Sequence, residues 1–207
     1  VEDVLTGPLN RTADRHGGFV AALWHEEVFS VAYAYRHMGG HTVASTGNFG
    51  LIITRLLELC NFTVFRGGAS RGSARKRRVL NDMIHNFRTE PRVPYGITVD
   101  GSRGPAYHMK PGSVVIARSC RAPLMVGRVW YSNYVRLSTW DRTVIPLPFG
   151  RIKVVAVGPY WVRPDGGKAE LEGAVEHLQS ELRDLAHHTI HEIEGRSFGD
   201  APEGFPE

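Results

Sequence analysis

Residues 18–40 read GFVAALWHEEVFSVAYAYRHMGG, and this stretch indicates the class of fold. An apolar run up to Trp24 predicts a buried strand that ends at His25. The residues that follow have the pattern of a helix, which Gly39 and Gly40 bring to an end. A strand that leads directly into a helix is the unit from which parallel sheets are built.

The same unit recurs along the first two thirds of the chain. In chain order, the predicted elements are a strand at 41–46 with a helix at 48–60, a strand at 62–65 with a helix at 73–87, and a strand at 95–99 with a short helix at 112–120, followed by an apolar run at 122–131. The helix at 48–60 has an apolar face formed by Leu51, Ile52, Leu56 and Leu59. Strands that alternate with helices predict an α/β fold with a mostly parallel, mixed sheet flanked by helices.

The last third of the chain has a different pattern. Residues 134–162 contain two further strand-like runs around an IPLPF segment, with no helix between them, which predicts an antiparallel edge. Residues 168–195 have leucines at intervals of three and four, as in an amphipathic helix that docks on the body of the protein. We therefore expect one α/β domain over residues 1–195 and a flexible tail at 196–207.

The composition is that of a folded, basic protein. Of the 207 residues, 42% are hydrophobic and 22% are charged, which is enough to bury a core. The formal net charge is +4 and the isoelectric point is about 9.3, so the surface favours anionic partners such as nucleic acid, phosphorylated metabolites or lipid headgroups. No DNA-reading or RNA-binding motif is present, which disfavours nucleic acid. The two cysteines, Cys60 and Cys120, favour a reduced, cytosolic setting.

The sequence shows no membrane-spanning or secretory segment. No uncharged apolar run reaches the ~18 residues of a spanning helix, and the start of the chain lacks the basic and apolar parts of a signal peptide. The first residue is valine rather than methionine, which leaves room for an upstream segment such as an anchor. The basic run from Arg71 to Arg78 is a candidate contact with anionic lipid.

Three predicted strands end at residues suited to chemistry. His25 follows the first strand, Arg66 follows the third, and Asp100 and Arg103 follow the fourth in the loop DGSRGP. The carboxyl ends of parallel strands share one edge of the sheet, so these side chains are predicted to lie together. His25 is a candidate general base, because imidazole titrates near neutral pH, and a purely structural histidine is the alternative.

Basic residues near this edge are suited to binding phosphate. Arg66 and Arg71 flank glycines in the loop RGGASRG, where guanidinium and backbone N–H groups can converge on an anion before the helix at 73–87. An ordinary solvated loop is the alternative. The loop lacks the Gly-Lys-Ser/Thr ending of a nucleotide-binding P-loop, so we do not expect hydrolysis of nucleoside triphosphates. His187 and His191 have the spacing of a metal-binding pair, but no third ligand is suggested, and we predict no metal.

Five blocks occur in order along residues 19–162: ALWH, VFRGGASRG, ITVDGSRGPAYHMKPG, APLMVGRVWY and WDRTVIPLPF. Their order and spacing resemble the lysophospholipid acyltransferase superfamily, especially a bacterial branch with an Asp-Gly-Pro-Arg-Gly-Pro type loop. The resemblance assigns roles as follows: His25 as the general base, Arg66 as the arginine of the second block, Asp100, Gly101 and Arg103 as the third block, and Pro123 as the fourth.

Two departures from the family pattern concern the acidic residues. The family has His-x4-Asp, whereas five residues after His25 this chain has Ser30. The acid that orients the imidazole would therefore be Glu26, Glu27 or one that the fold brings in. Asp100 replaces the usual glutamate of the third block, which keeps the charge and shortens the reach by one methylene.

The resemblance implies an acyltransferase that moves a fatty acyl group from acyl-CoA or acyl-carrier protein to a hydroxyl of a lysophospholipid-like acceptor. The thioester supplies the activation, so no metal or bound cofactor is expected. The catalytic candidates are His25, Glu26, Glu27 and Asp100, and the substrate-binding candidates are Arg66, Arg71, Gly101, Ser102, Arg103, Lys110 and Pro123. The alternative is a non-catalytic lipid-binding or assembly module. The expected partners are an acyl thioester, a phosphate-bearing lipid and the anionic inner face of the membrane, where a cytoplasmic protein would bind peripherally.

Overall fold

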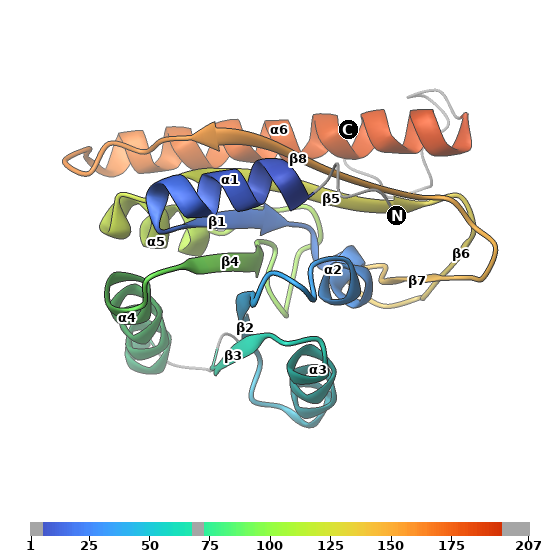
Figure 1. The fold of residues 1–207 in the computed structure, drawn as a ribbon, viewed down its shortest axis with the longest axis horizontal. Helices are drawn as coiled ribbons and strands as arrows, with labels where there is room; N and C mark the ends of the chain where they lie inside the picture. The colour runs from blue at the N-terminus through green and yellow to red at the C-terminus, as the bar shows by residue number, and fades with distance from the viewer. Residues whose placement is uncertain (1–5, 68–72, 196–207) are drawn as a thin grey trace.

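The computed structural model describes residues 6–67 and 73–195, and its centre is a six-stranded sheet in the order β3-β2-β4-β1-β5-β8 (Figure 1). The strands are β1 (Gly18–Leu23), β2 (His41–Ala44), β3 (Thr63–Arg66), β4 (Val93–Thr98), β5 (Leu124–Tyr131) and β8 (Ile152–Tyr160). β1 pairs in parallel with β4 and β5, and β2 pairs in parallel with β3 and β4. β8 pairs antiparallel with β5. The predicted class, a mostly parallel α/β sheet with an antiparallel edge, is therefore confirmed.

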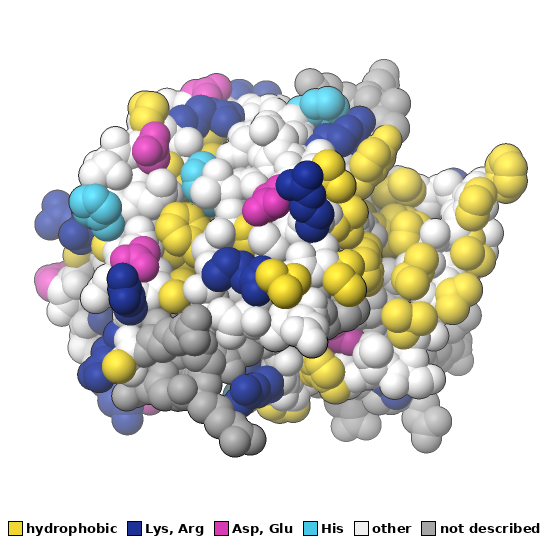
Figure 2. Space-filling view, turned by 90° about the horizontal axis from the view of Figure 1, so that it is seen from below, with side chains coloured by type: hydrophobic (Ala, Val, Ile, Leu, Met, Phe, Trp, Pro, Cys, Tyr) yellow, Lys and Arg dark blue, Asp and Glu magenta, His cyan; other side chains and the backbone are white. Residues whose placement is uncertain are grey.

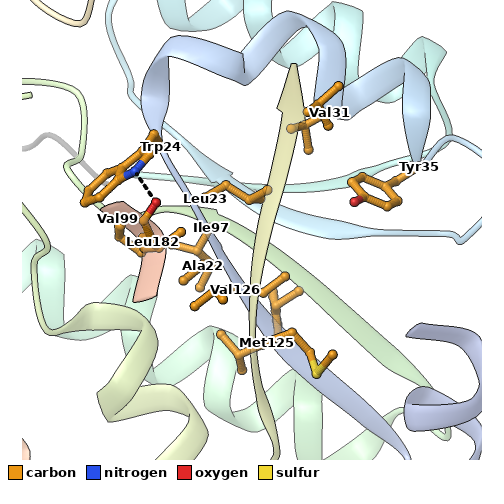
Figure 3. Packing of buried hydrophobic residues seen from close by; sticks show 14 of the residues in the cluster. Ala22, Leu23, Trp24, Val31, Tyr35, Ile97, Val99, Met125, Val126 and Leu182 are labelled. Atoms are coloured by element: carbon orange, nitrogen blue, oxygen red, sulfur yellow. Dashed lines mark hydrogen bonds between the residues drawn. The ribbon is translucent and has the colours of Figure 1, made fainter. Parts of the chain in front are cut away.

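Helices cover both faces of this sheet. They are α1 (Thr6–His16), the short 3-10 helix η1 (His25–Glu27), α2 (Val28–Ala34), α3 (Asn48–Leu59), α4 (Ser73–Thr89), α5 (Gly112–Cys120) and α6 (Lys168–Glu194). Successive side chains of a strand point to opposite faces, and β1 shows what covers each one. Phe19, Ala21 and Leu23 line a small apolar cavity together with residues of α1 and α2. The next side chain, Trp24, donates from its indole nitrogen to the carbonyl oxygen of Leu182 in α6 at 3.3 Å (Figure 3).

The long helix α6 packs along the sheet as an amphipathic helix. Leu178, Leu182 and Leu185 are buried, and α6 contacts β5 and α5. The four-residue and three-residue spacing of these leucines places them on one side of the helix. The predicted docking helix is therefore confirmed.

The apolar face predicted for α3 is wrong. Leu51, Ile52 and Leu59 are exposed, whereas the buried apolar side chains of this helix are Ile53 and Leu57. The helix is apolar over more than half of its circumference, so periodicity alone does not identify the side that meets the sheet. The structure buries side chains one position further along the chain, and of the predicted face only Leu56 is half-buried.

Between β5 and β8 the chain forms a separate two-stranded ribbon, β6 (Tyr134–Arg136) and β7 (Val144–Pro146), which extends beyond the sheet beside α2 (Figure 1). The sequence predicts strand-like runs here but not this ribbon. The turn at residues 137–143 joins its two strands.

Some sequence predictions fall on residues that the structure leaves undescribed. Arg71 and the predicted tail at 196–207 lie outside the described residues, and the assignment of one domain to residues 1–195 stays a prediction. Of the helices in the described ranges, none is both long enough and apolar enough to cross a membrane.

Candidate active site

The carboxyl ends of β1 and β4 bring His25 and Asp100 together. These strands pair in parallel, with Leu23 opposite Thr98, so the residues that follow them lie at the same edge of the sheet. The backbone N–H of His25 donates to Oδ1 of Asp100 at 2.9 Å. A second backbone donor, the N–H of Tyr107, lies 3.4 Å from Oδ2 of Asp100. The Asp100 carboxylate therefore joins the start of η1 to the loop that follows β4.

The imidazole of His25 pairs with a carboxylate from a distant part of the chain. Its Nδ1 lies 2.8 Å from Oδ2 of Asp141, in the turn between β6 and β7. Burial by itself would raise the pKa of Asp141, but hydrogen bonds from His25, Thr139 and Thr143 outweigh it and hold that pKa well below its usual range. An ionised carboxylate only accepts hydrogen bonds, so Nδ1 carries the proton, and in the neutral imidazole the lone pair is then on Nε2. This is the tautomer that a general base requires.

Two threonines of the same turn fix the orientation of Asp141. The hydroxyl of Thr139 donates to Oδ1 of Asp141 at 2.5 Å, and the backbone N–H of Thr143 lies 3.3 Å from the same oxygen. Trp140 of the same turn lies beside the imidazole, with its ring centroid 5.1 Å from that of His25. The turn therefore positions both the carboxylate and the aromatic wall of the site.

Of the alternatives that the sequence leaves open for the orienting acid, the structure has the one that the fold brings in, and the assignment of this role to Glu26 or Glu27 is wrong. Both side chains are fully buried and point to Arg128 of β5 instead. Glu26 also accepts from Tyr107 Oη at 2.8 Å and from Arg136 Nη1 at 3.0 Å. The short helix η1 turns these carboxylates into the interior as it turns the imidazole toward the edge of the sheet.

Glu27 and Asp100 both titrate above the usual range of carboxyl groups. Burial raises the pKa of Glu27 to about 7, although Arg128 opposes this shift. Burial also raises the pKa of Asp100 to about 6, against the opposing effect of His25. Two buried acids with raised pKa values beside a histidine are typical of a functional site, and they are equally compatible with a structural network.

Lys110 holds the loop after β4 through two hydrogen bonds. Nζ of Lys110 donates to the carbonyl oxygen of Asp100 at 2.5 Å and to that of Gly104 at 2.9 Å. Gly101 adopts a φ of +66°, the left-handed conformation that favours glycine, within this closed turn. Lys110 thus supports the turn on which Ser102 is presented.

A cavity of about 200 Å³ begins at this edge and continues between the sheet and helices α2 and α3. Its polar end is formed by His25, Ser102 and Lys110. Most of the other side chains that line it are apolar, among them Leu23, Val28, Val31, Val43, Ile53, Leu57 and Phe62, and Thr42, Ser45, Thr98 and Ser113 add hydroxyl groups. The site therefore combines a candidate base with a hydrophobic recess.

Several predicted substrate-binding residues lie outside this cavity. Arg103 is exposed on the loop, one residue beyond Ser102, and is absent from the lining. Nη1 of Arg66 donates to the hydroxyl of Thr54 in α3 at 2.7 Å, so this guanidinium anchors α3. Pro123 precedes β5 and accepts a hydrogen bond from Val20, toward the amino ends of the strands. The structure therefore does not bring Pro123 to the edge where His25 lies.

Sequence reasoning missed Asp141 as the partner of His25. The residue lies in the block WDRTVIPLPF, to which no catalytic role was assigned. One signal does single it out, because residues 101–164 contain no other aspartate or glutamate. A lone acid in a basic, apolar stretch is a better candidate for a functional carboxylate than a member of an acidic surface run.

Replacing Gly104 by alanine is expected to destabilise the protein by about 1–2 kcal/mol. Gly104 has a φ of +61°, and a Cβ there would lie 2.7 Å from the ring of Trp140. The measurement is the free energy of unfolding in urea. Gly173→Ala is the control, because Gly173 lies in α6 with open space around it, and it should gain roughly 0.5–1 kcal/mol. Equal stability of Gly104→Ala and the parent would contradict the close packing of Trp140 on this loop.

The described residues contain no group of three or more His, Cys, Asp or Glu side chains arranged to hold a metal ion. The predicted pair of His187 and His191 thus has no such group around it in these ranges. The absence of a cofactor stays a prediction.

The fold is similar to that of a solved acyltransferase structure. No protein-family model matches the chain. The structure is similar to the crystal structure of the 1-acyl-sn-glycerophosphate acyltransferase PlsC from Thermotoga maritima, with a TM-score of 0.50 and 16% sequence identity. The match covers 82% of this chain but 66% of that protein, slightly less than two thirds of its length. At this identity the similarity establishes an acyltransferase-like fold.

One curated protein is similar to this chain in sequence. The chain is 27% identical over 169 residues to the uncharacterized protein RP090 of Rickettsia prowazekii (strain Madrid E). The match covers 81% of this chain and 73% of that protein.

Proposed function

We propose that this protein is an O-acyltransferase that moves a fatty acyl group from a thioester donor to the hydroxyl of a lysophospholipid-like acceptor. The observation that carries the proposal is the pairing of His25 with Asp141 at the polar end of a mostly apolar cavity. The acyltransferase-like fold supports it. The absence of an acid at position 30 is an argument for a non-catalytic module. The turn after β6 supplies a carboxylate to His25, so this argument no longer applies.

In the proposed reaction, Nε2 of His25 accepts the proton of the acceptor hydroxyl while the hydroxyl oxygen attacks the thioester carbonyl carbon. The new C–O bond forms and the C–S bond breaks. The proton then passes from the imidazolium to the departing sulfur, which leaves as a free thiol. Asp141 stabilises the positive charge that the imidazole carries between these two proton transfers. The thioester supplies the activation, and the step needs no metal or bound cofactor.

The apolar end of the cavity is suited to an acyl chain. Each methylene that leaves water contributes about 0.8 kcal/mol, and side chains such as Val31, Ile53 and Phe62 provide the surface for it. The polar end holds the reacting groups. When the acyl chain occupies the apolar end of the cavity, the thioester carbonyl lies near His25.

The headgroup of the acceptor would bind at the loop after β4. Arg103 is exposed there beside Ser102, which lines the cavity, and a guanidinium offers a phosphate two parallel donors. The donor as acyl-CoA or acyl-carrier protein, and the action of a cytoplasmic protein at the inner face of the membrane, are parts of the same proposal.

The test is to incubate the purified protein with a panel of lysophospholipids and with acyl-CoA or acyl-carrier protein, and to follow thiol release together with the acylated lipid. His25→Ala is expected to lower transfer by at least about 100-fold. His108→Ala, which removes an exposed histidine from the loop after β4, is the matched control and should keep the parental rate. Lipid binding without turnover of any donor and acceptor would favour the non-catalytic alternative.

A further inference from the structure

The ribbon of β6 and β7 presents apolar side chains to solvent beside the candidate site. We call these residues the apolar ribbon face: Val135, Ile145, Leu147 and Phe149. Val135 and Ile145 are direct cross-strand partners, and both are exposed. The neighbouring Val144 is fully buried, so the ribbon has one inner and one outer side. Figure 2 shows hydrophobic side chains gathered over this part of the molecule, at the right of the view.

Phe149 is the most prominent member of this face. It is fully exposed, and its backbone adopts a φ of +65°, a conformation that bulky L-residues rarely take. The backbone N–H of Leu147 donates to the carbonyl oxygen of Asn133 at 3.0 Å, which continues the pairing of β6 with β7 by one residue toward Phe149. Backbone strain of this kind persists where it serves a purpose. In this conformation the Phe149 ring extends away from the protein, where it is available to an external apolar medium.

Arginines outnumber acids in the segment that forms the apolar ribbon face. Between residues 132 and 152 the charged side chains are Arg136, Asp141, Arg142 and Arg151. Asp141 is buried against His25 and Arg136 pairs with the buried Glu26, whereas Arg151 is exposed. The two acids that α6 brings nearby have partners of their own, Glu192 with Lys153 and Glu194 with Tyr134. An apolar tip with basic residues beside it complements a membrane surface that contains anionic lipid.

We propose that the apolar ribbon face docks on an anionic lipid bilayer, with Phe149 inserted below the headgroups. The turn of the same ribbon carries Asp141 and the half-exposed Trp140. It lies at the end of the short ribbon away from Phe149, because Arg136 and Val144 pair next to the turn and Tyr134 and Pro146 pair at the other end. A ribbon that lies along the membrane through its apolar face brings the entrance beside His25 to the lipid surface. A lipid acceptor would then reach the base directly from the bilayer. This last consequence rests on the proposed acyl transfer, whereas the docking itself does not.

A bilayer fits this surface better than a second copy of the chain. A stable dimer buries roughly 800 Å² on each partner, which a few partly exposed side chains on a narrow ribbon do not provide. A protruding ring with positive charge beside it suits a soft, negatively charged surface. Insertion of a single aromatic side chain also needs no shape-matched pocket.

The test is co-sedimentation of the full chain with vesicles of phosphatidylcholine containing about one third phosphatidylglycerol. The parent protein is expected to bind, and more weakly at high salt. Phe149→Ser should weaken binding by at least about tenfold, the value expected when one large apolar side chain no longer leaves water. Leu59→Ser is the matched control, because Leu59 is also exposed but lies at the far end of α3. It should bind as the parent does.

Three results would overturn the docking proposal: no binding of the parent to these vesicles, equal losses in Phe149→Ser and Leu59→Ser, or a dimer in sedimentation velocity that Phe149→Ser abolishes. Two further measurements distinguish failure of the docking proposal from failure of the proposed reaction. His25→Ala should bind vesicles like the parent. Phe149→Ser should slow transfer to an acceptor embedded in vesicles at least about tenfold and leave transfer to a short-chain, water-soluble acceptor unchanged.

Discussion

Replacing Asp141 by asparagine is expected to lower acyl transfer by about 10²–10⁴-fold. Asparagine has nearly the same size as aspartate, but its amide can donate to Nδ1 of His25, where the carboxylate accepts at 2.8 Å. That change favours the tautomer with the proton on Nε2, which leaves no lone pair to take the proton of the acceptor hydroxyl. It also removes the negative charge that stabilises the imidazolium. The effect should appear in kcat more than in KM, since Asp141 does not line the cavity.

The measurement is initial rates of thiol release and acylated lipid, together with the nitrogen chemical shifts of His25, which report its tautomer without any substrate. Asp165→Asn removes an exposed acid and should change neither reading. Ser30→Asp in the Asp141→Asn background tests whether the position used by the resembling family can take over. We expect no rescue, because Ser30 is a buried residue of α2, whereas His25 meets its partner at the edge of the sheet. Full activity of Asp141→Asn would show that His25 does not work through this carboxylate.

The sequence predicts the fold well where structure depends on neighbours along the chain. Each β-α unit signals its own strand and helix, and parallel pairing then brings His25 and Asp100 to one edge. Prediction fails where a helix is apolar on several sides, as in α3. There the buried stripe depends on how the helix lies on the edge strands, which local spacing does not encode.

The candidate site divides in the same way. His25 and Asp100 follow parallel strands, so topology places them. Asp141 lies 116 residues from His25 in a turn of an antiparallel ribbon, and its position depends on how that ribbon folds beside α2. The adjacency of Glu26 to His25 suggests contact, but neighbouring residues in a helical turn point in different directions. The carboxylate nearest in sequence therefore faces the interior, and the distant one meets the imidazole.

Replacing Arg128 by methionine is expected to cost about 3–5 kcal/mol of stability, the range for breaking a buried ion pair on one side. Arg128 is fully buried in β5, and its Nη1 contacts Glu26 and donates to Oε1 of Glu27 at 3.1 Å. Methionine keeps much of the volume but leaves both carboxyl groups without this cation. The measurement is the free energy of unfolding in urea. Arg55→Met, which breaks an exposed pair with Glu58, is the control and should cost less than about 1 kcal/mol.

The loss in Arg128→Met should grow as the pH rises. In the parent, burial already raises the pKa of Glu27 to about 7 from 4.5, while Arg128 opposes that shift. A folded state that holds a proton that the unfolded state has released loses stability as the pH increases. The free energy of unfolding of the parent is therefore expected to decrease between pH 4.5 and 7. Without Arg128 the pKa of Glu27 rises further, so the free energy of unfolding of Arg128→Met should continue to decrease above pH 7. Arg128→Met combined with Glu26→Gln and Glu27→Gln should remove most of this pH dependence. A loss that is the same in acid and in base would mean that Arg128 stabilises β5 by packing against Trp130 rather than by pairing with the two glutamates.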